Sequence, residues 1–196
     1  MGSSESPADA CRAFDQRLDR ELWVVTSADG DRAGGLVATF VSLASIVPEL
    51  PRVLAGIARG HRTWELIEAS GAFAAHLLGE GRLDWVARFG LQSGRTADKL
   101  AGLEHRPGRS GSPILSGAAG WLDCRVEARL ETGDRTVYLA EVIDAHAPGA
   151  GQILTVHRML QLVSEETRAR LSEDLRRDAA ADAEAIGLWR DGGPAD

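Results

Sequence analysis

The chain contains 196 residues, 44% of them hydrophobic, and carries a formal net charge of −7 at pH 7. This length and apolar content suffice for one substantial core, so a single domain is expected. The negative charge argues against a nucleic-acid partner, and no run of apolar residues is long enough to span a membrane. The first residues also lack a basic region followed by an apolar one, and we therefore expect a cytoplasmic protein.

The first third of the chain is predicted to contain one helix followed by strands. Residues Ser6–Arg20 have amphipathic spacing and are expected to form a helix that packs on the rest of the domain. Glu21–Ser27 is the first expected strand, and Asp29-Gly30-Asp31 supplies a tight turn. Two further β-favouring runs, Leu36–Leu43 and Val53–Ala58, are separated by a bend that contains two prolines.

Polar residues gather in segment 34–63, around these two runs and the helix that follows. Hydroxyl groups come from Thr39, Ser42 and Ser45, and the approach to the helix RTWELIEAS contains Arg59, His61, Arg62 and Thr63. Uncapped amides at a helix N-terminus, flanked by cations and hydroxyls, favour a phosphate. On these local features alone, the simpler interpretation is that Thr63 is an N-cap and that the arginines form a solvated rim.

The middle of the chain alternates between buried elements and open loops. Residues Ala72–Leu78 predict a buried strand, in which His76 is a hydrogen-bonded structural residue. Gly81–Phe89 predicts a surface helix with one apolar face. The polar, glycine-containing segment 91–102 is the expected mobile loop at the mouth of a pocket, and it contains Lys99, the only lysine of the chain.

A long hairpin is predicted after an irregular segment. Residues His105–Gly117 are rich in Gly, Pro, Ser and Arg and are expected to lack regular structure. Apolar and charged residues then alternate from Leu122 to Leu130, which predicts a half-buried strand. Beyond the turn Thr132-Gly133-Asp134, residues Thr136–Ala145 return as its antiparallel partner.

Helical spacing dominates after residue 155. Residues His157–Val163 predict one short helix, and Ser164 is expected to cap a second helix that ends at Gly187. Its narrow apolar stripe consists of Leu171, Leu175, Ala179 and Ile186. A narrow stripe with dense charge fits a helix that lies across the domain or a partner subunit, and it fits a solvated tail equally well.

Taken in order, several short motifs of this chain resemble the flavin reductase family. They are VVTS at 24–27, the D-G turn, GLVATFVSLAS at 35–45, TWELIEASGAF at 63–73, Leu83–Phe89, Lys99, Gly111–Leu115, Leu122-Asp123-Cys124, Gly133-Asp134-Arg135 and Glu141-Val142. The resemblance covers Leu22 to Ala145. It implies a β-rich α+β fold, an FMN-binding split barrel of the antiparallel Greek-key type with about six strands, peripheral helices and a helical C-terminus.

The same resemblance divides the chain and implies an assembly. Residues 1–20 would form an N-terminal helical segment, residues 21–150 the flavin-reductase-like barrel domain, and residues 151–196 a C-terminal helical extension. Members of the family usually pair as dimers, so a homodimer with its interface near the flavin is expected.

The resemblance also implies which residues bind FMN or, alternatively, FAD. Carried over position by position, they are Val37, Ala38, Thr39, Phe40, Ser42, Ser45, Ala58, Arg59, His61, Arg62, Thr63, Phe89, Lys99 and Arg135. Two departures from the family pattern stand out. Arg135 replaces a histidine that lies near the nicotinamide in many members, and Pro48 and Pro51 are separated where adjacent prolines are common.

The residues themselves show no nucleophile elbow, paired carboxylates or phosphate-binding Gly-Lys loop, and Cys11 and Cys124 have neither metal-ligand nor disulfide-framework spacing. Hydride transfer between NADH or NADPH and a flavin fits this absence, because it needs binding and alignment and no catalytic side chain. The expected function is an NAD(P)H-dependent flavin reductase that can supply reduced flavin to a monooxygenase partner. The alternatives are an FMN-binding or electron-carrier module without reductase activity and an FMN-dependent oxidase of the pyridoxamine-phosphate-oxidase type.

Overall fold

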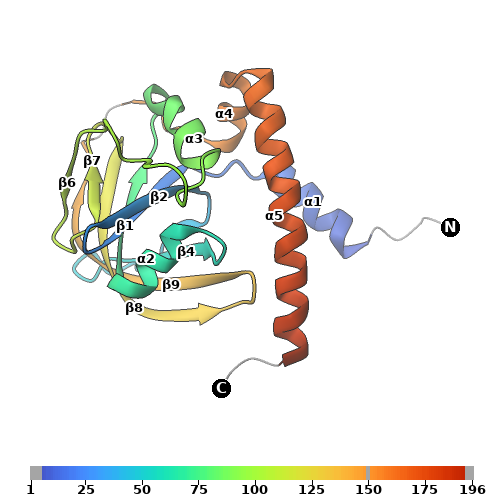
Figure 1. Cartoon of the computed structure of the whole chain (residues 1–196), viewed down its shortest axis with the longest axis horizontal. Coiled ribbons are helices and arrows are strands. Elements are labelled where there is room, and N and C mark those ends of the chain that lie inside the picture. The colour runs from blue at the N-terminus through green and yellow to red at the C-terminus, as the bar shows by residue number, and fades with distance from the viewer. Residues whose placement is uncertain (1–5, 149–150, 193–196) are drawn as a thin grey trace.

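A computed structural model describes residues 6–148 and 151–192 of the chain. Its centre is a seven-stranded sheet of order β2-β1-β5-β8-β9-β4-β3, in which all neighbouring strands are antiparallel. The two edge strands, β2 and β3, are separated in sequence only by Thr39 and Phe40. The sheet therefore curls until its edges approach each other, and the resulting split barrel with peripheral helices confirms the predicted fold class (Figure 1).

The strands of the main sheet are β1 (Trp23–Asp29), β2 (Arg32–Ala38), β3 (Val41–Leu43), β4 (Arg52–Ala58), β5 (Ala72–Leu77), β8 (Gly120–Glu131) and β9 (Arg135–His146). A separate two-stranded sheet contains β6 (His105–Pro107) and β7 (Pro113–Leu115). The helices are α1 (Pro7–Arg17), α2 (Arg62–Ser70), α3 (Leu83–Gly90), α4 (Val156–Leu162) and α5 (Glu165–Gly192), with a 3-10 turn, η1 (Glu80–Arg82), before α3.

Local turn chemistry sets the register of the two long hairpins. Gly30 adopts φ +58° between β1 and β2, where Asp29 pairs with Arg32, and Gly133 adopts φ +90° between β8 and β9. Positive φ costs glycine little because it has no Cβ. Both predicted turns are confirmed.

Apolar side chains form two clusters, one inside the barrel and one between the barrel and the helices. Val25, Phe73 and Tyr138 belong to the interior cluster, whereas Val24 and Trp85 belong to the cluster beneath α3 and α4. Strand β1 contributes to both clusters because successive side chains of a strand point to opposite faces. This double coverage explains why residues Val24 to Ser27 are buried without alternation.

The prediction that His76 is structural is confirmed. Its Nδ1 lies 3.0 Å from the Val24 carbonyl oxygen, and its Nε2 accepts a hydrogen bond of 3.0 Å from the Leu115 amide. Burial lowers the pKa of His76 to about 4. The ring is therefore neutral at pH 7 and ties β5 to β1 and β7.

Two predictions for the second half of the sheet are wrong. Residues 105–117 are not irregular throughout, because they contain the paired strands β6 and β7. The apolar alternation of β8 also fails at both ends: Leu130 is 62% exposed, and Asp123 is buried and accepts a hydrogen bond from the Ser110 amide. Register shifts beside Asp123 and Val126 turn the side chains out of simple alternation.

The outlying helices differ from expectation in their packing and length. Helix α1 ends earlier than predicted and buries no residue, and Phe14 and Leu18 are exposed, so the predicted packing of this helix on the domain is wrong. Helix α5 continues past Gly187 to Gly192. It runs along one side of the barrel beside the β8–β9 turn (Figure 1). Within the described residues, no helix combines the length and the apolar character that crossing a membrane requires.

Candidate functional site

A pocket of about 360 Å³ lies at the split of the barrel. It is called the large pocket below, because a smaller one adjoins it. The end of β2, the Thr39-Phe40 link and the end of β4 form its walls, and Gly60, His61 and Arg135 lie at its rim. Gly56 is required here, because a Cβ at this position would lie 2.2 Å from the Phe40 ring. The Gly56 amide donates a 2.9 Å hydrogen bond to the Phe40 carbonyl. This close approach holds the aromatic ring against β4 as one apolar wall of the pocket.

Helix α5 supplies the remaining wall of this pocket. Its contribution comes from Leu175, Asp178, Ala181 and Asp182. Asp182 Oδ2 lies 3.2 Å from the Arg135 guanidinium, which also pairs with Asp134 at 2.5 Å. Burial raises the pKa of Asp182, and Arg135 opposes that rise. The positive charge of Arg135 is therefore shared between two carboxylates.

A smaller pocket of about 60 Å³ adjoins the first at Leu36, Gly60 and His61. It lies at the N-terminus of α2 and is also lined by Arg62, Thr63, Phe89, Lys99 and residues 92–95. The N-cap of α2 is His61, whose side chain makes no capping hydrogen bond. Backbone amides at such a helix start, with a cationic side chain beside them, suit an anionic group.

Thr63 is not the N-cap, which corrects the sequence-based prediction. It is the second residue of α2 and is buried, with 2% of its surface exposed. The chain turns into the helix one residue earlier than the motif suggests, because His61 has the extended backbone of a cap (φ −86°, ψ 141°). The Thr63 side chain consequently lines the small pocket.

Lys99 is buried although segment 91–102 is a loop. Its Nζ donates hydrogen bonds of 3.1 Å to the Gly35 carbonyl and 2.8 Å to the Phe89 carbonyl. Burial lowers the pKa of Lys99 to about 8. The side chain therefore ties the loop to β2 and to the end of α3 while it lines the small pocket.

His61 stands where the two pockets meet. Neighbouring protein atoms desolvate the His61 ring and lower its pKa although part of the residue is exposed, the carboxylate of Asp178 opposes that shift, and the charge of Lys99 adds to it. The imidazole is therefore neutral at pH 7 and can donate or accept a hydrogen bond. It does not add a positive charge to the site.

The structure brings most of the predicted site residues together and leaves three outside. Around the large pocket lie Val37, Ala38, Thr39, Phe40, Ala58, His61 and Arg135, and around the small pocket lie His61, Arg62, Thr63, Phe89 and Lys99. Ser42 is exposed and Ser45 is half-buried, and neither lines a pocket of this site. Arg59 instead lies over the Trp64 ring, 5.3 Å from its centroid, and forms an ion pair with Glu131.

Sequence reasoning missed the wall from α5 and the residues 92–95. The latter lie in the loop predicted at a pocket mouth, so their position carried a usable signal. The sequence gives no signal that Asp178 and Asp182 belong to the site, because an acidic residue on a charged helix is usually solvated. Their place in the site depends on how α5 lies against the barrel.

The two joined pockets fit a flat ligand with an anionic end. Leu36, Val37 and Ile57 offer apolar contact, and the carboxylates of Asp178 and Asp182 offer hydrogen-bond acceptors. The uncapped start of α2 and Arg62 offer donors to an anion. A ligand of this kind has an apolar ring with polar edges at one end and a phosphate at the other.

The fold and the pockets define a split-barrel protein with a nucleotide-sized site at the barrel's split. More specifically, the chain belongs to the flavin reductase like domain family, whose model matches residues 16–161. The match ends shortly before α5, so this helix lies outside the matched region although it lines the pocket.

Named relatives and solved structures agree with this assignment. The chain is 36% identical over 121 residues to the reductase subunit of a flavin-dependent monooxygenase from Mycobacterium tuberculosis, and the alignment spans 62% of this chain and only 62% of the relative's length. It is 28% identical to an FMN reductase (NADH) of Pseudomonas syringae, across 74% of this chain and 80% of the relative. The NADH:FAD oxidoreductase of Streptomyces globisporus has a similar fold, with a TM-score of 0.68, 23% identity, and coverage of 79% of this chain and 93% of that chain.

Proposed function

We propose that this protein binds a flavin nucleotide, reduces it with NADH or NADPH, and supplies the reduced flavin to a partner oxygenase. The observation that carries the proposal is the pair of joined pockets at the barrel split, in a chain that belongs to the flavin reductase like domain family. The monooxygenase partner is suggested by the relative from Mycobacterium tuberculosis, which is named as a reductase subunit.

The contribution of the protein is binding and alignment. The apolar walls from β2 and β4 would hold the flavin ring, and the start of α2 with Arg62 and Thr63 would hold a phosphate. A bound flavin supplies the capacity to accept a hydride from a nicotinamide. Phe40 and α5 would exclude water from one side of the ring, and neutral His61 would hydrogen-bond the ligand between ring and phosphate.

The second candidate is a flavin-binding module without reductase activity. It is favoured by one specific observation: Arg135, at the position where many family members have histidine, is paired with Asp134 and Asp182. These pairs leave the guanidinium less able to bind the phosphates of a dinucleotide. The choice between the two candidates therefore depends on whether a nicotinamide can reach the ring.

Four finer points remain part of the proposal. They are FMN as the preferred flavin, the homodimer, the cytoplasmic location, and the division into segments 1–20, 21–150 and 151–196. The relative named as an FMN reductase supports the first of them, and the homodimer, the cytoplasmic location and the division stay predictions.

An anaerobic absorbance experiment tests the activity. The FMN-loaded protein is mixed with NADH and, separately, with NADPH, and the visible absorbance of the flavin is followed. We expect rapid bleaching with at least one donor, and slower bleaching in Arg135→Ala if this arginine aids the dinucleotide. Arg12→Ala, an exposed position on α1, is the matched control. If neither donor bleaches the bound flavin, the reductase proposal is wrong and the binding module is the better account.

A further inference from the structure

A third pocket, of about 570 Å³, lies on the far side of Arg62 from the small pocket. The two pockets share Arg62, Gly94 and Arg95 in their linings, so they lie next to each other. Gly94 lies at the boundary between them and close to both cationic side chains: a Cβ there would lie 3.6 Å from the Arg62 Cβ and 3.8 Å from the Lys99 Cε. The third pocket is therefore an extension of the proposed phosphate site.

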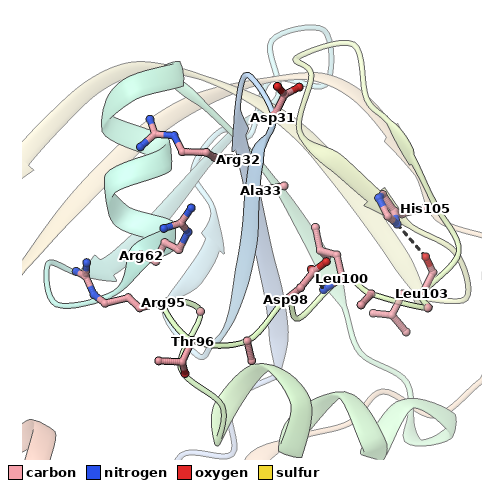
Figure 2. A pocket seen from close by; sticks show the side chains of 14 residues that line it. Asp31, Arg32, Ala33, Arg62, Arg95, Thr96, Asp98, Leu100, Leu103 and His105 are labelled. Carbon is pink, nitrogen blue, oxygen red and sulfur yellow. Dashed lines mark hydrogen bonds between the residues drawn. The ribbon is translucent and has the colours of Figure 1, made fainter.

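Positive charge is concentrated on one side of this pocket. Figure 2 shows Arg32, Arg62 and Arg95 together on the side of α2, whereas Asp98 and His105 lie on the opposite side. Arg32 pairs with Asp29, and Arg95 pairs with Glu65 at 2.5 Å. These pairs are solvent-exposed, and exposed ion pairs contribute about 0–1 kcal/mol. Both guanidiniums can therefore turn to a bound anion at small cost.

The opposite side offers different chemistry. The partly buried Leu103 provides apolar surface, with the buried Leu100 beside it, and the carboxylate of Asp98 already accepts a 2.9 Å hydrogen bond from the Leu100 amide. The His105 ring is held by a 2.8 Å hydrogen bond to the Leu103 carbonyl, drawn as the dashed line in Figure 2. Apolar surface, an aromatic ring and a carboxylate suit a purine base and the hydroxyls of a ribose. A simple phosphate would leave most of this volume unused.

We propose that this pocket binds the adenosine diphosphate half of a dinucleotide, with Arg62 beside its diphosphate and Arg32 as the arginine specific to the adenylate side. The proposal rests on the proposed function and adds a ligand class to it. Two dinucleotides contain this half, FAD and NAD(P)H. FAD would place its ring in the split of the barrel and its adenylate here, and NAD(P)H would use the pocket as a second substrate.

Calorimetric titration of the flavin-free full chain with ADP tests the pocket directly. ADP is expected to bind the parent protein, and Arg32→Ala is expected to weaken ADP about tenfold while it leaves FMN affinity unchanged. Arg12→Ala, exposed on α1, is the matched control and should change neither affinity. The proposal is overturned if ADP does not bind, or if Arg32→Ala has the same ADP affinity as the parent.

Further arms of the same experiment identify the source of the adenylate. If FAD is the ligand, FAD binds the parent more tightly than FMN, and Arg32→Ala removes that advantage. If NAD(P)H is the ligand, FAD and FMN bind alike, and Arg32→Ala raises the KM for the dinucleotide in the FMN-loaded protein. FMN binding reports separately on the proposed function, because a protein that fails to bind FMN fails that proposal whether or not ADP binds.

Discussion

At the scale of single residues, Lys99 combines a structural and a binding position. Its ammonium group is buried between the carbonyls of Gly35 and Phe89 and also faces the small pocket. Two backbone hydrogen bonds offset part of the cost of burying a charge, yet the pKa of about 8 shows that the cost is not fully offset.

This imbalance predicts how Lys99 affects stability at alkaline pH. An unfolded lysine has a pKa of about 10.4, so between pH 8 and that value the unfolded chain binds more protons than the folded one. Stability therefore gains with rising pH in this window. Relative to Lys99→Met, the free energy of unfolding of the parent should increase by up to about 3 kcal/mol from pH 8 to pH 10.5. Urea unfolding of both proteins at several pH values measures this free energy. Subtracting the value for Lys99→Met from the value for the parent cancels the ionisation of other groups. An unchanged difference across this range would show that Lys99 is solvated.

The sequence predicted which residues belong to the site better than it predicted what each of them does there. Lys99 and Thr63 were both marked from the sequence, but a loop lysine is usually solvated and a threonine before a helical run is usually a cap. In the structure, Lys99 is buried and connects its loop to β2 and α3 by hydrogen bonds, and Thr63 is buried and lines the small pocket. For Lys99 the deciding contact is with Gly35, which is distant in sequence and is not encoded in local patterns. For Thr63 the difference is local, because the helix begins one residue earlier than the motif suggests.

At the scale of elements, α5 and the β8–β9 turn depend on each other. A Cβ on Gly133 would lie 2.7 Å from the Trp189 Cβ and 2.9 Å from the Ala185 carbonyl oxygen, and Gly133 has φ +90°. Glycine thus permits both the turn and the close approach of α5. No residue of α5 is buried, so few contacts hold this helix in place.

Gly133→Ala should therefore displace α5 from the pocket. We expect faster proteolysis within residues 165–192, a shift in tryptophan fluorescence from Trp189, and a lower melting temperature because the residue is strained at this φ. Flavin affinity should change in the same variant, since Leu175, Asp178 and Asp182 would leave the wall of the pocket. Gly187→Ala is the matched control, because a Cβ at Gly187 meets no atom within 4 Å. Equal proteolysis rates for parent and Gly133→Ala would contradict this placement of α5.

Elements with strong local signals were predicted well, and those shaped by distant contacts were not. The turns at Gly30 and Gly133 were found because they need glycine at positive φ. Strands β6 and β7 were missed because each has only three residues, and Asp123 on β8, which binds the loop between them, looked like a solvent-facing residue. The short strands exist through tertiary contacts that their own sequence does not show.

At the scale of the whole molecule, several exposed apolar residues follow Phe40 of the large pocket in sequence. Leu43 at the end of β3 is exposed, and in the link from β3 to β4 Ile46 is fully exposed and Val47 and Leu50 are also exposed. Phe40, a wall of the large pocket, is 41% exposed next to them. Contiguous apolar surface of this kind usually marks an interaction site, and edge strand β3 can also pair with another chain. Both features support the proposed homodimer with its interface near the flavin.

The double variant Leu43→Asp/Ile46→Asp tests this assembly. Two carboxylates in an apolar interface would be buried without partners, at a cost of several kcal/mol, so a dimer formed through this surface should dissociate. Light scattering at micromolar concentration should give about twice the chain mass for the parent and the chain mass for the variant. Leu188 is the matched control position, because it is 68% exposed but lies on α5 and lines neither pocket of the site, and Leu188→Asp should remain dimeric. If the parent itself is a monomer, the homodimer is wrong. If both aspartate variants stay dimeric, the subunits meet through another face, and the apolar residues of 43–50 must be covered by something other than a second copy of this chain.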